Sequence, residues 1–208
     1  MSSDQAAPRE DPRTAFPPTR SPLSLAIVLL GSGLIGWAAS AQLVLERLAL
    51  YADPNYVTTC DVSPFVSCGA VFRTAQASVF GFPNPLIGIV AFAVVITTAM
   101  ALLAGGHVSR WYWLGLQTGV TAGLAFVGWL WFQTLFVISI LCLYCMVVWV
   151  AMIVIFVAVT AHNIRTGVLP AGPTGRRIAA DWWWVIAVLL ILATAVSVFL
   201  AFAGALFS

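Results

Sequence analysis

The chain has 208 residues, of which 62% are hydrophobic and only 8% are charged, and its formal net charge is +2. Soluble domains carry about 25% charged residues, so this composition excludes a soluble enzyme, a disordered protein and a secreted disulfide scaffold. The nine basic residues are all arginines, and they form no basic stripe that could follow a phosphate backbone, so nucleic acid is not expected as a partner. We predict an all-α integral membrane protein whose surroundings are the lipid bilayer.

The first 22 residues are rich in Pro, Ser and Arg, which predicts a disordered cytoplasmic tail over residues 1–22. The rest of the chain contains uncharged apolar runs, and a membrane-spanning helix needs about 20 such residues. One run, from 111 to 164, is long enough to cross, turn and cross back. We therefore predict five spans, over the ranges 23–45, 85–104, 111–131, 140–161 and 182–202.

The first span has an alternative interpretation as a secretory signal peptide, because Ala39-Ser40-Ala41 matches the small-residue pattern of a cleavage site. The apolar part of a signal peptide has about 7 to 15 residues. This run is longer and continues to Leu45, past the proposed cut. The first span is therefore expected to be a permanent anchor.

The orientation follows from the arginines, since positive residues are enriched in cytoplasmic loops. Seven of the nine fall on one side of the predicted spans, and only Arg47 and Arg73 fall on the other. We predict a cytoplasmic amino terminus, an outer loop over residues 46–84, a cytoplasmic loop over residues 162–181 and an extracytoplasmic carboxyl terminus. No charged residue lies within a predicted span, so the usual signature of an ion pathway is missing.

Small residues in two spans predict close helix packing. Gly115, Gly119 and Gly123 recur at four-residue steps in the third span, which is typical of a ridge on which a neighbouring helix packs. We expect Gly31 and Gly36 to serve the same purpose in the first span.

The four cysteines map to one face of the membrane. Cys60 and Cys68 lie in the outer loop, and Cys142 and Cys145 lie at the outer end of the fourth span. In bacteria this face borders the oxidising compartment, where disulfides form and persist. The chain is therefore expected in the bacterial plasma membrane, with thiol chemistry at its outer face.

The cysteine spacings predict two different pairs. Residues three apart on a helix, such as Cys142 and Cys145, lie about 5 Å apart, within the range of a disulfide. We expect Ser139 to cap this helix, which would put Cys142 in the first turn, where the helix dipole favours a thiolate. Cys60 and Cys68 would lie about 12 Å apart on a helix, so they need a loop that doubles back.

Three other roles for the cysteines remain as alternatives. Two structural disulfides could staple the loop to the bundle. A structural zinc site favours two close pairs of cysteines, and only Cys142 and Cys145 have that spacing. A haem would need axial ligands, but His107 and His162 fall at the cytoplasmic ends of spans. We expect no metal site.

Four motifs together resemble the bacterial form of the vitamin K epoxide reductase family. They are Cys60-Asp-Val-Ser-Pro-Phe-Val-Ser-Cys68, Val71-Phe72, Phe80-Gly-Phe-Pro-Asn84-Pro-Leu-Ile-Gly88 and Cys142-Leu-Tyr-Cys145. The disulfide-bond protein B family does similar chemistry but places its Cys-x-x-Cys motif first. The resemblance covers residues 23–161 and implies a four-helix transmembrane bundle around a quinone, to which a fifth helix over residues 182–208 is added.

The resemblance also implies a path for electrons. Cys60 would exchange with an external reduced protein, Cys68 would attack Cys142, and Cys145 would pass electrons to the quinone. Each exchange needs a thiolate that attacks a disulfide sulfur. Many bacterial relatives carry a thioredoxin-like domain after the fifth span, whereas this sequence ends at Ser208, so the expected partner is a separate thioredoxin-fold (DsbA-like) protein.

The quinone, menaquinone or ubiquinone, is expected in an apolar pocket with a polar anchor. The resemblance implies that Asn84 bonds a quinone carbonyl and that Val71, Phe72, Thr74 and Trp149 contribute to the pocket. Thr74 stands where a serine is common, and Trp149 stands where the animal enzymes have a tyrosine. Apolar residues at helical spacing predict a short amphipathic helix over residues 71–80 that caps the quinone.

The predicted function is therefore the oxidation of an extracytoplasmic thioredoxin-fold protein with transfer of its electrons to a quinone, in support of disulfide bond formation. Two alternatives stay open. One is a reductase that recycles a quinone or its epoxide with the same residues. The other is a membrane scaffold that is stapled by disulfides and has no enzymatic activity.

Overall fold

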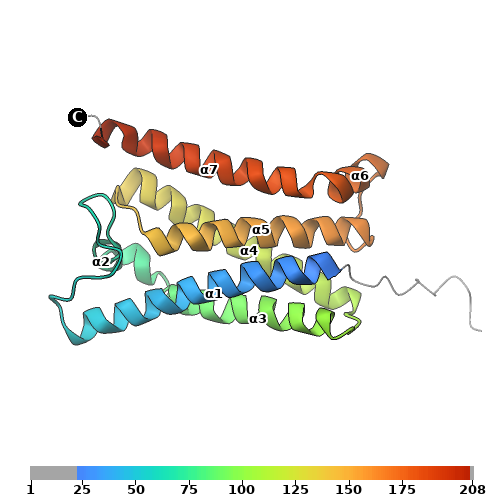
Figure 1. The fold of residues 1–208 in the computed structure, drawn as a ribbon, viewed down its shortest axis with the longest axis horizontal. Helices are drawn as coiled ribbons and strands as arrows, with labels where there is room; N and C mark the ends of the chain where they lie inside the picture. Colours follow the sequence, from blue (N-terminus) through green and yellow to red (C-terminus); the bar gives the residue numbers. More distant parts are fainter. Residues whose placement is uncertain (1–22, 207–208) are drawn as a thin grey trace, which may run out of the picture.

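The computed structural model describes residues 23–206, so the predicted tail over residues 1–22 lies outside the described residues. Figure 1 shows that the described residues are almost entirely helical, with two isolated β-bridges and no strand in this part of the chain. The elements in order are α1 (Leu23–Ala52), α2 (Cys68–Phe72), the 3-10 helix η1 (Ala75–Ser78), α3 (Pro85–Leu103), α4 (Arg110–Gln133), the π-helix η2 (Thr134–Ile138), α5 (Leu143–Arg165), α6 (Pro173–Asp181) and α7 (Trp183–Leu206).

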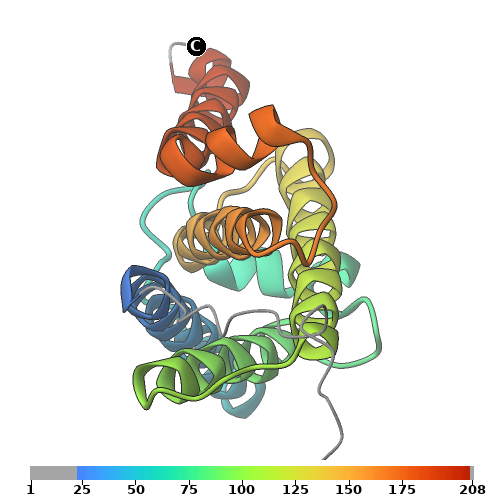
Figure 2. The same cartoon turned by 90° about the vertical axis from the view of Figure 1, so that its right-hand side faces the viewer.

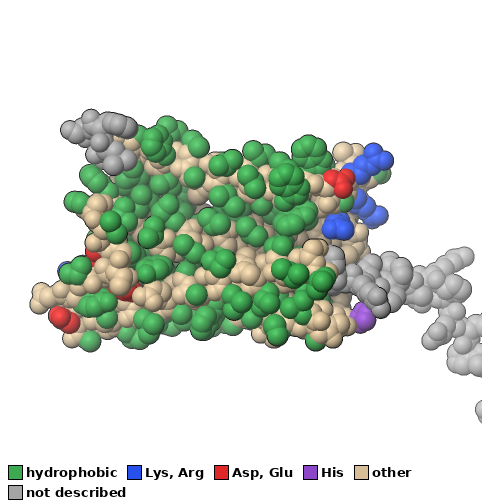
Figure 3. All heavy atoms as spheres, in the orientation of Figure 1, with side chains coloured by type: hydrophobic (Ala, Val, Ile, Leu, Met, Phe, Trp, Pro, Cys, Tyr) green, Lys and Arg blue, Asp and Glu red, His purple; other side chains and the backbone are tan. Residues whose placement is uncertain are grey.

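Five of these helices are long and apolar enough to cross a membrane, which confirms the five predicted spans and the all-α membrane fold. They are α1, α3, α4 with its extension η2, α5 and α7. On the face drawn in Figure 3, hydrophobic side chains cover the middle of the molecule and the charged groups lie toward its two ends. This distribution fits an apolar belt in lipid between two polar surfaces.

The helices of the bundle contact one another to different extents. α1 packs against α3 and α5, and α4 packs against α5, while α7 lies outside against α5 (Figure 2). α3 and α4 meet near their connecting loop, where the hydroxyls of Thr98 and Tyr112 lie 2.5 Å apart. Further along, α4 crosses behind α5 toward α7 and makes few contacts with α3 (Figure 1). Along most of their length, α3 and α4 therefore do not pack directly against each other.

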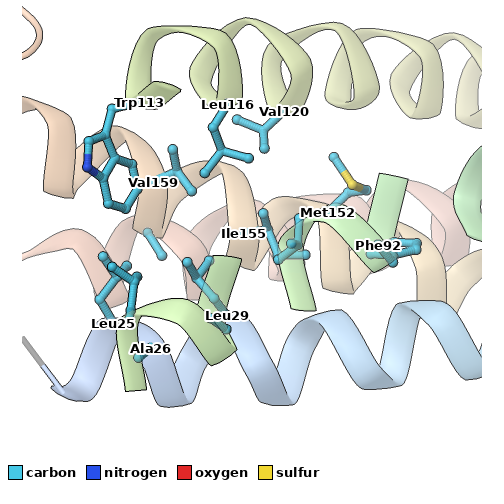
Figure 4. Close-up of a cluster of buried hydrophobic side chains, with 14 of the residues drawn as sticks. Leu25, Ala26, Leu29, Phe92, Trp113, Leu116, Val120, Met152, Ile155 and Val159 are labelled. Atoms are coloured by element: carbon cyan, nitrogen blue, oxygen red, sulfur yellow. The ribbon is translucent and has the colours of Figure 1, made fainter. Parts of the chain in front are cut away.

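The core lies where α1, α3, α4 and α5 face one another. Leu29, Phe92, Ile155 and Val159 are almost fully buried there, and Leu116 of α4 packs on the same cluster (Figure 4). Lipid tails are as apolar as these side chains, so burial alone does not hold membrane helices together. Close van der Waals contact between the helices must provide the stability.

Glycines allow this contact at fewer positions than expected. Gly36 lies directly against the ring of Phe92, and Gly88 lies against the hydroxyl of Ser40, so α1 and α3 approach closely. The expectation for Gly36 is confirmed, but Gly31 has no neighbour within 4 Å. Gly115 and Gly119 have none either, and only Gly123 of the predicted ridge meets a neighbour, the side chain of Met152. The ridge was wrong because α4 presents Trp113, Leu116 and Val120 to the core instead.

The element boundaries also differ from those predicted. α1 continues to Ala52, so that the charged pair Glu46 and Arg47 lies inside the helix and is buried. Its 30 residues extend about 45 Å at 1.5 Å per residue, beyond a hydrocarbon core of about 30 Å. The third span continues as η2, and the loop predicted over residues 162–181 contains α6.

Candidate functional site

The outer loop is joined to the start of α5 by backbone hydrogen bonds. Val66 forms a parallel bridge with Leu141, in which the Ser67 N–H donates to the Leu141 carbonyl (3.0 Å) and the Leu141 N–H donates to the Phe65 carbonyl (2.8 Å). Ser67 and Leu141 each directly precede a cysteine. The bridge therefore brings Cys68 beside Cys142, with 3.3 Å between their sulfur atoms.

Three sulfur atoms gather in one buried cluster. Cys60 and Cys68 form a disulfide with a Cα–Cα distance of 5.6 Å, and Cys142 and Cys145 are free thiols. The Sγ atoms of Cys60, Cys68 and Cys142 all lie within 4.8 Å of one another. Zinc binds cysteine as the thiolate, and two of these three sulfurs are already bonded to each other. The arrangement suits disulfide exchange better than metal binding.

The helix that carries the second pair begins one residue after Cys142. Cys142 is itself the N-cap of α5, and its sulfur accepts the N–H of Cys145 at 3.4 Å. The prediction that Ser139 caps this helix was wrong. Ser139 instead ends η2 with a positive φ of 54°, which reverses the chain direction before Cys142.

Asp61 fixes the loop around the disulfide. Its carboxylate accepts hydrogen bonds from the Ser67 hydroxyl (2.6 Å), the Thr58 N–H (3.0 Å) and the Gly69 N–H (3.1 Å). Burial raises the pKa of Asp61, but the hydrogen bonds from Ser67, Thr58 and Gly69 outweigh it and hold the pKa below its ordinary value. The charged form of Asp61 therefore stabilises the loop.

Glu46 is a site residue that the sequence analysis missed. Its buried carboxylate accepts the hydroxyl (2.6 Å) and the N–H (3.2 Å) of Thr59, next to Cys60, and the amide of Gln42 (2.9 Å). The hydroxyl of Thr59 also lies 3.1 Å from that of Tyr144, between the two cysteines of α5. Glu46 marked the end of an apolar run in the sequence, and nothing there indicated that it turns inward.

Arg47 fixes the second half of the outer loop, which contains α2 and η1, whereas Glu46 fixes the first half, which contains Cys60. Its guanidinium donates to the Phe72 carbonyl and, at 3.1 Å, to the Ser78 hydroxyl, and it lies over the Phe72 ring. Phe72 ends α2 and Ser78 ends η1. Two successive residues of α1 thus fasten the two halves of the loop.

Beneath α2 and η1 lies a cavity of about 140 Å³ with a mainly apolar lining from α1, α3, α4 and α5. Cys145 reaches this cavity, as do four of the predicted quinone contacts: Val71, Phe72, Asn84 and Trp149. The fifth, Thr74, is not in the lining, and its hydroxyl donates to the Val71 carbonyl at 2.7 Å.

The roof of the cavity differs from the single helix predicted over residues 71–80. The chain forms two short helices there, α2 and η1, and Gln76 and Ala77 line the cavity together with Val71 and Phe72. Val79, predicted on the apolar face, is exposed. The helical period was interrupted because the backbone turns at Arg73 and Thr74 between the two helices.

Asn84 is already engaged within the protein. Its side-chain amide donates to the Gln76 carbonyl at 2.6 Å, and its side-chain oxygen accepts the Val79 N–H at 3.2 Å. Asn84 therefore stabilises η1 in the roof of the cavity. The amide nitrogen has two hydrogens, so one can still be offered to a ligand in the cavity.

Comparison with known proteins identifies one family. The model of the vitamin K epoxide reductase family matches residues 27–160. This segment runs from α1 to α5 and contains the four cysteines and the cavity. No individual curated protein matches the chain.

Proposed function

Because the chain belongs to the vitamin K epoxide reductase family, we propose that it oxidises an extracytoplasmic thioredoxin-fold protein and passes the electrons through its cysteine pairs to a membrane quinone. Family membership makes it a multi-pass membrane thiol–disulfide oxidoreductase, and the clustered cysteines fit that redox role. One observation carries the finer proposal. Cys68 lies 3.3 Å from Cys142, at the junction between the loop disulfide and the thiol that reaches the cavity.

The cysteines would act in sequence. A thiolate of the partner attacks Cys60, which breaks the Cys60–Cys68 bond and releases the Cys68 thiolate. That thiolate attacks Cys142 of an oxidised Cys142–Cys145 pair and releases the Cys145 thiolate. The second thiolate of the partner attacks the partner's sulfur in the mixed disulfide, which releases the oxidised partner and the Cys60 thiolate. Cys60 then attacks Cys68, which re-forms the loop disulfide and leaves two thiols on α5. The arrangement described above, with a loop disulfide and two free thiols, corresponds to this last state.

The cavity suits the electron acceptor. A quinone accepts two electrons and two protons and leaves as the quinol, so that the two thiols of α5 become a disulfide. An apolar cavity with few polar groups matches a quinone ring, and Cys145 is the thiol of α5 that reaches it. The separation of α3 from α4 would admit an isoprenoid tail directly from the bilayer.

The proposed location is the bacterial plasma membrane, with the amino terminus in the cytoplasm. The arginine distribution supports this orientation. It would place the four cysteines on the extracytoplasmic side, where a thioredoxin-fold partner is accessible.

The decisive experiment is stopped-flow reduction of ubiquinone-1 or menadione by the purified protein, with a reduced thioredoxin-fold protein as donor. We expect a donor that retains only its attacking cysteine to accumulate a mixed disulfide with Cys60, visible on a non-reducing gel, and Cys60→Ala to abolish it. Cys145→Ala should stop quinone reduction but still permit a Cys68–Cys142 disulfide. Ser63→Ala, in the exposed part of the loop, is the matched control and should behave as the unchanged protein.

The proposal fails if Cys60→Ala oxidises the donor and reduces quinone at the normal rate. A scaffold role predicts instead that Cys145→Ala has no effect and that no quinone is reduced. A recycling reductase predicts turnover with a quinone epoxide in place of the quinone.

A further inference from the structure

Most serine and threonine hydroxyls in the membrane helices bond a carbonyl of their own helix. Ser32, Thr97, Thr98, Thr118, Thr121, Thr194 and Ser197 each donate to a carbonyl three or four residues earlier. Two buried residues of these helices, Ser40 and Thr134, make no such bond. Their hydroxyls are not among the fully enclosed side-chain polar atoms without a partner, which in the described residues are Trp131 Nε1 and Asn163 Oδ1. Ser40 and Thr134 both line the cavity that Cys145 reaches. Their hydroxyls therefore keep some accessible surface beside the cavity, where a ligand can bond them.

These two residues are not equivalent. The Ser40 hydroxyl lies against Gly88 of α3, so it fills the contact between α1 and α3. Thr134 begins the π-helix η2, which ends at Ser139 in a left-handed conformation. Irregular backbone within a membrane span is tolerated where it lines a cavity, and π-turns occur frequently at functional sites.

From these two observations we infer that the Thr134 hydroxyl donates a hydrogen bond to a carbonyl oxygen of the bound quinone. This inference rests on the proposed function. A quinone has two carbonyl oxygens on opposite sides of its ring. Asn84, which directly precedes α3, has a second side-chain N–H that can be donated to one of them. Thr134 of η2 supplies a second donor from a different wall of the cavity. It is therefore a residue that positions the ring, while Cys145 carries out the thiol chemistry.

The test compares three variants. Thr134→Val keeps the shape of the side chain but removes the donor, and Thr134→Ser keeps the donor. Thr118→Val is the matched control, because the exposed Thr118 of α4 bonds its own helix at the Leu114 carbonyl. The dissociation constants of ubiquinone-1 and menadione are measured by quenching of tryptophan fluorescence, together with kcat and KM for quinone reduction.

We expect Thr134→Val to weaken the binding of both quinones by about 3–10-fold, the effect of one lost hydrogen bond. Thr134→Ser should retain most of the affinity, and Thr118→Val should bind as the unchanged protein does. Reduction of the Cys60–Cys68 disulfide by the donor, measured without quinone, should keep its rate in all three variants. The infrared carbonyl stretch of bound ubiquinone-1 should move toward that of the free quinone in Thr134→Val but not in Thr134→Ser.

The outcomes separate the two proposals. If the unchanged protein binds and reduces quinone and Thr134→Val does so with the same affinity and carbonyl frequency, the role of Thr134 is refuted and the proposed function stands. If the unchanged protein neither binds nor reduces either quinone, both are refuted. If Thr134→Val is poorly folded, an unchanged carbonyl frequency in a Thr134→Ala variant would equally refute the role of Thr134.

Discussion

Asp61 determines the conformation of the segment that presents both loop cysteines. Its carboxylate gathers two backbone N–H groups and one hydroxyl from Thr58, Ser67 and Gly69, which flank Cys60 and Cys68. Ser67 in turn caps α2 by accepting the N–H of Ala70 at 3.0 Å. One charged group thus stabilises the turn around the disulfide and the start of the cavity roof.

This arrangement predicts a pH dependence of the loop. The folded-state pKa of Asp61 lies below its ordinary value, so its contribution is fully present above about pH 4 and is lost as the pH falls through the lower, folded-state pKa. Asp61→Asn should remove this acid dependence and weaken the loop by about 1 kcal/mol. Hydrogen exchange at the Gly69 amide measures both effects.

The control is Asp53→Asn, because the carboxylate of Asp53 accepts only the N–H of exposed Asn55 at 2.9 Å. This substitution should leave the exchange of Gly69 unaffected. Equal exchange protection of Gly69 in Asp61→Asn and in the unchanged protein, at neutral and acid pH, would contradict the prediction.

At the scale of the elements, α1 fixes the outer loop more than any other helix does. Its last turns carry Glu46 toward Thr59 and Arg47 toward Phe72 and Ser78. Glu46 thereby positions the segment before Cys60, and Arg47 positions α2 and η1 above the cavity. The two halves of the loop can therefore be disturbed separately.

We predict that Arg47→Met raises KM for quinone several-fold while the exchange between donor and Cys60 keeps its rate. The methionine retains the apolar stem but loses the hydrogen bonds to Phe72 and Ser78, which are worth about 1.5–3 kcal/mol each when a charged group donates them. Steady-state kinetics with varied quinone and varied donor separates the two effects.

Arg73→Met is the comparison variant, since exposed Arg73 donates only to the Pro54 carbonyl at 2.9 Å. It should leave KM for quinone unchanged. A parallel loss of donor exchange in Arg47→Met would show instead that the whole loop depends on this residue.

At the scale of the whole molecule, the two ends differ in their charge. Arg165, Arg176 and Arg177 gather near α6, whereas Asp53 and Asp61 lie at the end that carries the cysteines. On the face drawn in Figure 3, basic groups gather at the α6 end, beside an acidic group, and acidic groups prevail at the other end. This polarity agrees with the orientation proposed above.

Labelling from one side of the membrane tests the orientation. Single cysteines introduced at the exposed positions Ser63 and Thr174 should differ in how readily a maleimide labels them in intact spheroplasts. A membrane-impermeant maleimide should modify Ser63→Cys at once and Thr174→Cys only after the membrane is opened. The reverse pattern would invert the topology.

The sequence was sufficient for those features that the bilayer imposes. A span must be a continuous apolar run because its backbone groups find no water in the membrane, so the five spans and the loop between the first two were predictable. The shared position of the cysteines at one end of the bundle followed from the same count of spans.

Features that depend on which side of a helix meets a neighbour were not predictable. Gly119 and Gly123 have the same spacing pattern, yet only Gly123 contacts another helix. Glu46 adjoins an apolar run as any boundary residue does, and its inward orientation depends on Thr59, thirteen residues later. The π-helix η2 continues directly from α4, and a run of apolar residues does not distinguish a π-turn from an α-helical turn.

The quinone is proposed to enter from the side of the bundle between α3 and α4, and this route determines which quinone concentration controls the rate. A substrate that arrives through this side is dissolved in a two-dimensional phase, so its supply depends on its mole fraction among the lipids and not on its amount per volume of buffer. Added lipid vesicles that share the quinone should slow turnover at constant total quinone, while added buffer should not. A rate that follows total quinone regardless of lipid would mean that the substrate enters from water instead.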